Sequence, residues 1–152
     1  MGSSFTEYNK NGFWARDGQV EVWLYLLVQE IEKLESPPEW LIQAKQDWHL
    51  QATVGFTGCV SPSLDEIVTS EERKELVIRL CQSVLAKLKE IGPKLTVVAE
   101  YSYRTEGPEN LCNNVDKRIH EYYGQHFLNL LLGKISTNAS TSKVAWPPEV
   151  PY

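Results

Sequence analysis

The strongest constraint on the fold is a helical pattern that runs through residues 69–92. Thr69 is followed three residues later by Glu72, a spacing typical of a capping box at the start of a helix. Gly92 and Pro93 end the pattern, because neither residue favours continuing a helix. Between these ends, apolar residues recur at three- and four-residue steps: Leu76, Val77, Leu80, Val84, Leu85, Leu88 and Ile91. Other elements must cover this apolar stripe, so the pattern predicts a helical domain.

Two more helical patterns precede this stretch. Apolar residues follow the helical period over residues 18–35, and Asp17 is placed to cap that helix. A second pattern covers about 37–53 and carries most of its apolar residues on one face. The prolines at 37 and 38 break the chain between the two patterns. Because the link is so short, the two helices are predicted to form an antiparallel pair.

The second half of the chain is predicted to end in a helix over about 114–132, terminated by Gly133. Residues 55–63 read as a loop, and Ser63 with Glu66 is typical of a further capping box before a short helical turn. Residues 94–104 leave two alternatives open. Alternating apolar residues favour a strand there, whereas the preceding proline and the lack of an obvious partner strand favour a short helix. We expect the helix.

Together these patterns predict a mostly α-helical single domain over residues 1–152. It is expected to be a bundle of about four main helices with short extra helical or strand segments. Residues 1–16 show no period and are expected to form an irregular lead-in. Residues 136–152 are expected to form an extended tail, which Trp146 can anchor to the body of the domain.

The chain has a net charge of −5, and its first 60 residues hold most of it, with eight acidic and four basic side chains. Phosphate binding needs basic residues gathered on one face, so we expect no direct contact with nucleic acid. No segment reaches the ~18 apolar residues of a membrane span, so no membrane contact is expected. The odd number of cysteines without paired spacing is typical of a reducing compartment, which favours a cytoplasmic protein. Of these cysteines, Cys81 is expected in the core.

Catalytic and metal chemistry have little support in the sequence. His120 and His126 lie six residues apart on one predicted helix, which places them about 120° apart around its axis and does not favour a shared metal ion. Cys59 follows Gly58 in a predicted loop and is the only plausible nucleophile, although no catalytic motif surrounds it. We therefore expect no enzyme activity, no metal and no cofactor. A small cytosolic enzyme that uses Cys59 or a histidine remains an alternative, as does a structural adaptor module.

Tryptophans are concentrated in the first third of the chain, at Trp14, Trp23, Trp40 and Trp48. Trp40 and Trp48 are eight residues apart and share one helix face, and Trp23 faces inward on the neighbouring helix. A tryptophan-rich core between the first two helices explains these residues. The alternative is that one or two are exposed and anchor a protein partner, because tryptophan is enriched at interface hot spots.

Four features of the sequence occur together: Trp40-x3-Ala44-x3-Trp48, the loop from Gly58 to Leu64, the long helix that ends at Gly92, and the run from Phe127 to Gly133. In this combination the chain resembles immunity proteins of bacterial contact-dependent growth inhibition and polymorphic toxin systems. The resemblance covers about residues 20–135. It implies a small, acidic cytoplasmic protein that binds one cognate toxin domain tightly and blocks it. Such toxins are commonly nucleases, and the resemblance implies no catalysis by this chain.

Acidic residues mark a candidate surface for such a partner. They gather around the turn at 36–38, with Asp47 further along the next helix: Glu30, Glu32, Glu35, Glu39 and Asp47. A nuclease must be basic to hold phosphate, so an acidic surface can occupy its binding site and steer association. These five residues are the predicted partner-binding site. An ordinary solvated turn is the alternative interpretation.

Overall fold

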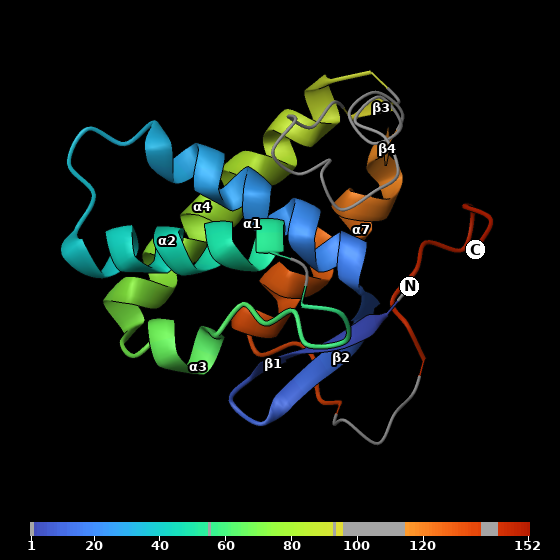
Figure 1. Ribbon diagram of the computed structural model, residues 1–152, viewed down its shortest axis with the longest axis horizontal. Coiled ribbons are helices and arrows are strands. Elements are labelled where there is room, and N and C mark those ends of the chain that lie inside the picture. Colours follow the sequence, from blue (N-terminus) through green and yellow to red (C-terminus); the bar gives the residue numbers. More distant parts are fainter. Residues whose placement is uncertain (1, 55, 93, 96–114, 138–142) are drawn as a thin grey trace.

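The computed structural model describes residues 2–54, 56–92, 94–95, 115–137 and 143–152. Within these ranges the chain is a mostly helical single domain with four main helices, as predicted, and an N-terminal hairpin. In chain order the elements are β1 (Ser3–Tyr8), β2 (Asn11–Arg16), α1 (Asp17–Glu32), α2 (Glu39–Val54), α3 (Leu64–Ile67), α4 (Glu71–Glu90), β3 (Lys94–Leu95), β4 (Val115–Asp116) and α7 (Lys117–Leu131). Figure 1 shows the hairpin at the lower edge of the helical body.

Helix α1 is the centre of the fold, because it packs against α2, α4 and α7. The largest buried side chains around it come from three helices, and they are Trp23, Trp48, Tyr123 and Phe127. Gly124 on α7 lets the helices approach closely, since a Cβ there would lie 2.2 Å from Cζ3 of Trp23. A glycine inside a helix normally lowers helix stability, and here it makes room for the indole.

The long predicted stripe on α4 is mostly correct. Its buried residues are Val77, Leu80, Cys81, Val84, Leu85 and Leu88, so Cys81 is a core residue as expected. Ile91 lies beyond the end of α4 and is 37% exposed, which the stripe did not predict. The helix cap is also shifted by one residue. Ser70, not Thr69, accepts a hydrogen bond from the backbone N–H of Arg73.

The expected irregular lead-in at residues 1–16 is wrong. β1 and β2 pair in antiparallel register from Ser3 opposite Arg16 to Tyr8 opposite Asn11. Asn9 and Lys10 both have positive φ, of 52° and 69°, which is the geometry of a two-residue hairpin turn. The buried side chains of β1 are polar, at Ser4 and Thr6, so the strand shows none of the apolar alternation that identifies strands in a sequence.

Two predicted helix starts need correction because the side chains serve other contacts. Asp17 is the first residue of α1, and its carboxylate is buried rather than placed as a cap. Ser63 has a left-handed backbone (φ 52°) and makes no capping hydrogen bond to α3. The end of α1 is also earlier than predicted, at Glu32 instead of residue 35, which leaves Leu34 38% exposed.

The junction between α4 and α7 is a short antiparallel pair of strands. Lys94 pairs with Asp116 and Leu95 with Val115, so the helix expected at 94–104 is wrong at its first two residues. Residues 96–104 lie outside the described residues. α7 starts at Lys117 rather than near 114, because the chain is still extended through β4.

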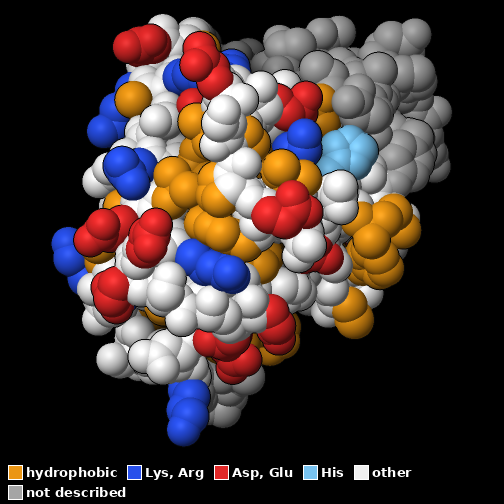
Figure 2. Space-filling view, turned by 90° about the vertical axis from the view of Figure 1, so that its left-hand side faces the viewer, with side chains coloured by type: hydrophobic (Ala, Val, Ile, Leu, Met, Phe, Trp, Pro, Cys, Tyr) orange, Lys and Arg blue, Asp and Glu red, His pale blue; other side chains and the backbone are white. Residues whose placement is uncertain are grey.

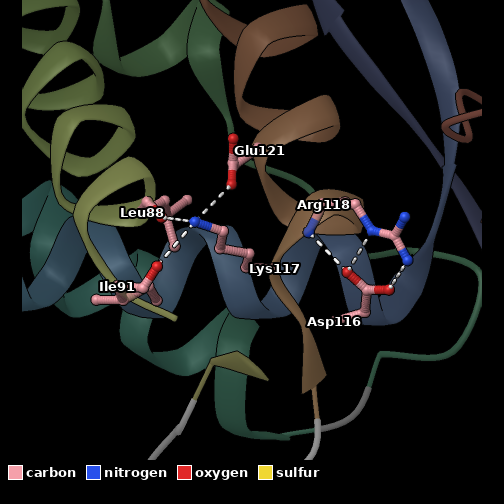
Figure 3. A network of polar contacts seen from close by, with 6 residues as sticks. All are labelled: Leu88, Ile91, Asp116, Lys117, Arg118 and Glu121. Atoms are coloured by element: carbon pink, nitrogen blue, oxygen red, sulfur yellow. Dashed lines mark hydrogen bonds and ion pairs between the residues drawn. The ribbon is translucent and has the colours of Figure 1, made fainter. Parts of the chain in front are cut away.

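Lys117 of α7 contacts the end of α4, as Figure 3 shows. Its Nζ donates to the carbonyl oxygens of Leu88 and Ile91 at 2.8 and 2.9 Å, and Glu121 lies 3.6 Å away. Carbonyls at the end of a helix lack intrahelical donors, and a cation is favoured at that negative end of the helix dipole. Asp116 caps α7 by accepting from the backbone N–H of Arg118 at 3.0 Å.

The far end of α7 stops at Gly133, as predicted. Gly133 has a φ of 75°, its N–H donates to the carbonyl of Leu130, and Lys134 N–H donates to Asn129. This pair of hydrogen bonds is a Schellman motif.

The chain then returns along the hairpin. Gly12 N–H donates to Thr137, and Ala145 N–H donates to Trp14. Trp146 is half-buried and donates to the Val150 carbonyl at 3.0 Å.

Candidate partner-binding surface

Three of the predicted site residues form one exposed group at the link between α1 and α2. Glu32, Glu35 and Glu39 are all exposed, and we call them the acidic turn. Within the described residues none of them forms an ion pair. The antiparallel packing of α1 and α2 places the end of one helix beside the start of the other, so the acids project from one end of the domain.

The face that carries this link is not uniformly acidic. Figure 2 shows acidic and basic side chains interspersed around a central group of hydrophobic side chains. A protein interface commonly has this composition, with an apolar centre inside a polar and charged rim. The acidic turn therefore belongs to a mixed surface, on which its three carboxylates are local negative charges.

Glu30 does not belong to this exposed group, although the sequence placed it there. Its side chain is only 11% exposed. Its Oε2 lies 3.3 Å from Nζ of Lys33 and forms a second ion pair with Lys87 on α4. The hydrogen bond with Glu30 raises the pKa of Lys87, so the ion pair favours the charged form of the lysine. Glu30 thus connects α1 to α4, and its negative charge is neutralised by Lys33 and Lys87.

Asp47 lies apart from the acidic turn, in a groove between α2, α3 and α4. The groove has a volume of about 330 Å³ and is lined by Trp40, Gln43, Ala44, Asp47, Ser63, Glu66, Ile67 and Arg73. Burial raises the pKa of Asp47, a hydrogen bond with Ser63 lowers it, and the charge of Glu66 raises it further. The sequence identified Asp47 as acidic and accessible, but it did not predict the groove, whose other walls come from distant residues.

The loop after α2 is held in place by a buried carboxylate. The two oxygens of Asp17 accept from the Ser4 hydroxyl at 2.6 Å and from Gly58 N–H at 2.9 Å. The Ser4 oxygen accepts in turn from Val60 N–H at 2.9 Å. Because a buried charge is costly unless it is hydrogen-bonded, this network fixes the loop to the hairpin and to α1. Cys59 is exposed on the loop.

The histidines that the sequence raised as candidates have different environments. His120 is buried, and within the described residues its Nδ1 has no hydrogen-bond partner. Burial lowers its pKa to about 4, against an opposing effect of Asp116. His126 is half-buried and packs against the rings of Tyr122 and Phe13. The described residues contain no group of three or more potential metal ligands.

The tryptophans are divided between fully and half-buried positions, so the core interpretation holds for Trp23 and Trp48, while partner anchoring by another tryptophan stays a prediction. Trp23 and Trp48 are fully buried, and the Trp48 indole donates to the Pro62 carbonyl at 2.7 Å. Trp40 is half-buried in the wall of the groove, with the Arg73 guanidinium 4.9 Å from its ring centre. Trp14 is also half-buried and lies in β2.

The fold defines the class of this protein as a mostly helical single domain. No protein-family model, no curated protein and no solved structure matches the chain. Across the described residues, no helix is both long enough and apolar enough to cross a membrane.

Proposed function

We propose that this protein is a cytoplasmic immunity protein that binds and blocks a cognate toxin domain, and that it is not an enzyme. The observation that carries the proposal is the acidic turn: Glu32, Glu35 and Glu39 are exposed, and none has an ion pair among the described residues. Three carboxylates in this state attract a basic partner and are available to it without breaking any described ion pair. A nuclease domain is the basic partner that fits best, since it must bind phosphate.

The alternative of a small enzyme rests on Cys59 or a histidine. Cys59 is exposed, and substituting it disturbs no buried contact that is described. His120 is buried, so a change there alters stability as well as any chemistry. Cys59 and His126 are therefore the better residues for separating the two classes of function.

The proposal is tested by protection in cells. The proposal predicts that the gene immediately upstream of this chain encodes a large secreted protein, whose C-terminal domain is expressed as the toxin with and without the chain. We expect the chain to restore growth and to copurify with the toxin domain in a one-to-one complex. Cys59→Ser and His126→Gln should protect as well as the wild type. Loss of protection by either variant while it remains folded would favour the enzyme alternative, and no protection by the wild type would refute the proposal.

A further inference from the structure

The charges around the groove between α2, α3 and α4 do not balance. Asp47 and Glu66 supply two carboxylates to its lining, and Arg73 supplies one cation. The Arg73 guanidinium is engaged in the wall itself, because its Nη1 donates to the Ile67 carbonyl at 3.2 Å and it lies over the Trp40 ring. The described lining thus has one negative charge in excess, which a single incoming cation would neutralise.

The carboxylate of Asp47 is partly buried, which disfavours its charged form. Its Oδ2 is shielded from solvent and has no hydrogen-bond partner among the described residues. Burial raises the pKa of this carboxyl group and the charge of Glu66 adds to the effect, against an opposing hydrogen bond with Ser63. A carboxylate kept in such a place lowers stability unless it is paired, and groups of this kind are concentrated at functional sites.

The lining of the groove begins one residue beyond the acidic turn along α2. Trp40 follows Glu39 directly at the start of α2. Trp40, Ala44 and Asp47 then lie on one side of that helix, because steps of three and four residues return to the same face. A partner that covers the acidic turn therefore reaches the mouth of the groove within the first turns of α2.

We propose that this groove receives one lysine or arginine side chain of the partner protein, with Asp47 and Glu66 pairing its charge and Trp40 packing against its aliphatic part. The inference rests on the proposed function, because it names a contact within the same interface. The choice of occupant follows from charge complementarity and from the residues that line the groove. An aromatic wall and excess negative charge fit a long cationic side chain, whose stem is apolar and whose end is charged.

The test is a titration of isotope-labelled protein followed in two-dimensional amide NMR spectra. The probes are N-acetylarginine amide and N-acetyllysine amide, with N-acetylcitrulline amide as the uncharged control of nearly the same shape. We expect the cationic probes to shift the Trp40 indole signal and the backbone signals of Asp47 and Ser63, and to saturate. The citrulline probe should leave these signals in place, because the attraction depends on charge.

Variants then assign the effect to the groove. Asp47→Asn should weaken probe binding at least about threefold, and Glu66→Gln should weaken it in the same direction. Glu72→Gln removes an exposed acid that does not line the groove and should bind as the wild type does. The urea midpoint of Asp47→Asn should equal or exceed that of the wild type, because the change removes a disfavoured charge.

Three results would overturn the proposal. Equal shifts with the citrulline probe, equal binding by Asp47→Asn, or the absence of any shift would each show that the groove does not receive a cation. A clear fall in the urea midpoint of Asp47→Asn would instead assign the carboxylate a structural role. The titration contains no toxin, so a negative result leaves the acidic turn and the proposed function standing. Failure to protect cells, in turn, does not affect the titration.

Discussion

His120 should make the fold sensitive to mild acid. Its imidazole is 4% exposed, and burial lowers its pKa from the ordinary 6.5 to about 4. The unfolded chain binds a proton at this residue below about pH 6.5, whereas the folded chain does not until about pH 4. Folding is therefore disfavoured progressively as the pH falls through this window, and the loss is complete below about pH 4. At about 1.4 kcal/mol for each pH unit, the whole window amounts to roughly 3 kcal/mol.

The measurement is urea unfolding of the wild type and of His120→Leu at about pH 7 and pH 4.5, where roughly 2.5 kcal/mol of this loss should have developed. Carboxylates also titrate over this range, so the informative quantity is the difference between the two proteins. The stability of His120→Leu should fall by roughly 2.5 kcal/mol less than that of the wild type. An equal fall in both proteins would show that the imidazole is protonated in the folded state, and would refute the argument from burial.

Two predictions concern positions where the backbone constrains the side chain. Gly124→Ala should lower the free energy of unfolding by at least about 2 kcal/mol, because the new Cβ would overlap the Trp23 ring, which is 2.2 Å away. A more stable variant in urea unfolding would mean that helix propensity outweighs this overlap. Lys10→Gly should raise stability by about 0.5–1 kcal/mol, because Lys10 has a φ of 69° in the hairpin turn and glycine adopts that conformation without strain. An unchanged or lower urea midpoint would show that the turn stores no such strain.

The helices could be predicted from the sequence because burial on one face of a helix leaves a periodic pattern. The residues of α4 from Val77 to Leu88 show this well. The hairpin could not be predicted in the same way. Its inward positions on β1 are Ser4 and Thr6, which are satisfied by Asp17 and by the Tyr123 hydroxyl and not by apolar contact. Its turn is also unusual, since Lys10 stands where glycine is preferred.

In the candidate site, the exposed residues could be predicted from the sequence, but the contacts between distant residues could not. Exposure of the acidic turn could be predicted from the proline break and from the charges around it. The pairing of Glu30 with Lys87 could not, because the two residues are 57 positions apart and meet only when α1 packs on α4. Likewise, the spacing of Trp40 and Asp47 predicts a shared helix face, but Glu66 and Arg73 close the groove from other elements.

If the acidic turn steers a basic toxin domain, its charges must govern the association rate of the two proteins. The perturbation is the triple variant Glu32→Lys, Glu35→Lys and Glu39→Lys. Its matched control places the same three charge changes elsewhere, at the exposed Glu75, Glu90 and Glu149. Both variants have the same net charge, so a difference between them reports position and not total charge.

Association with the toxin domain is followed by stopped-flow fluorescence at low and at high salt. The acidic-turn variant should associate at least about tenfold more slowly than the control at low salt, and the wild-type rate should fall as salt rises. Equal rates for the two variants, together with full protection of cells by both, would show that the toxin binds away from the acidic turn.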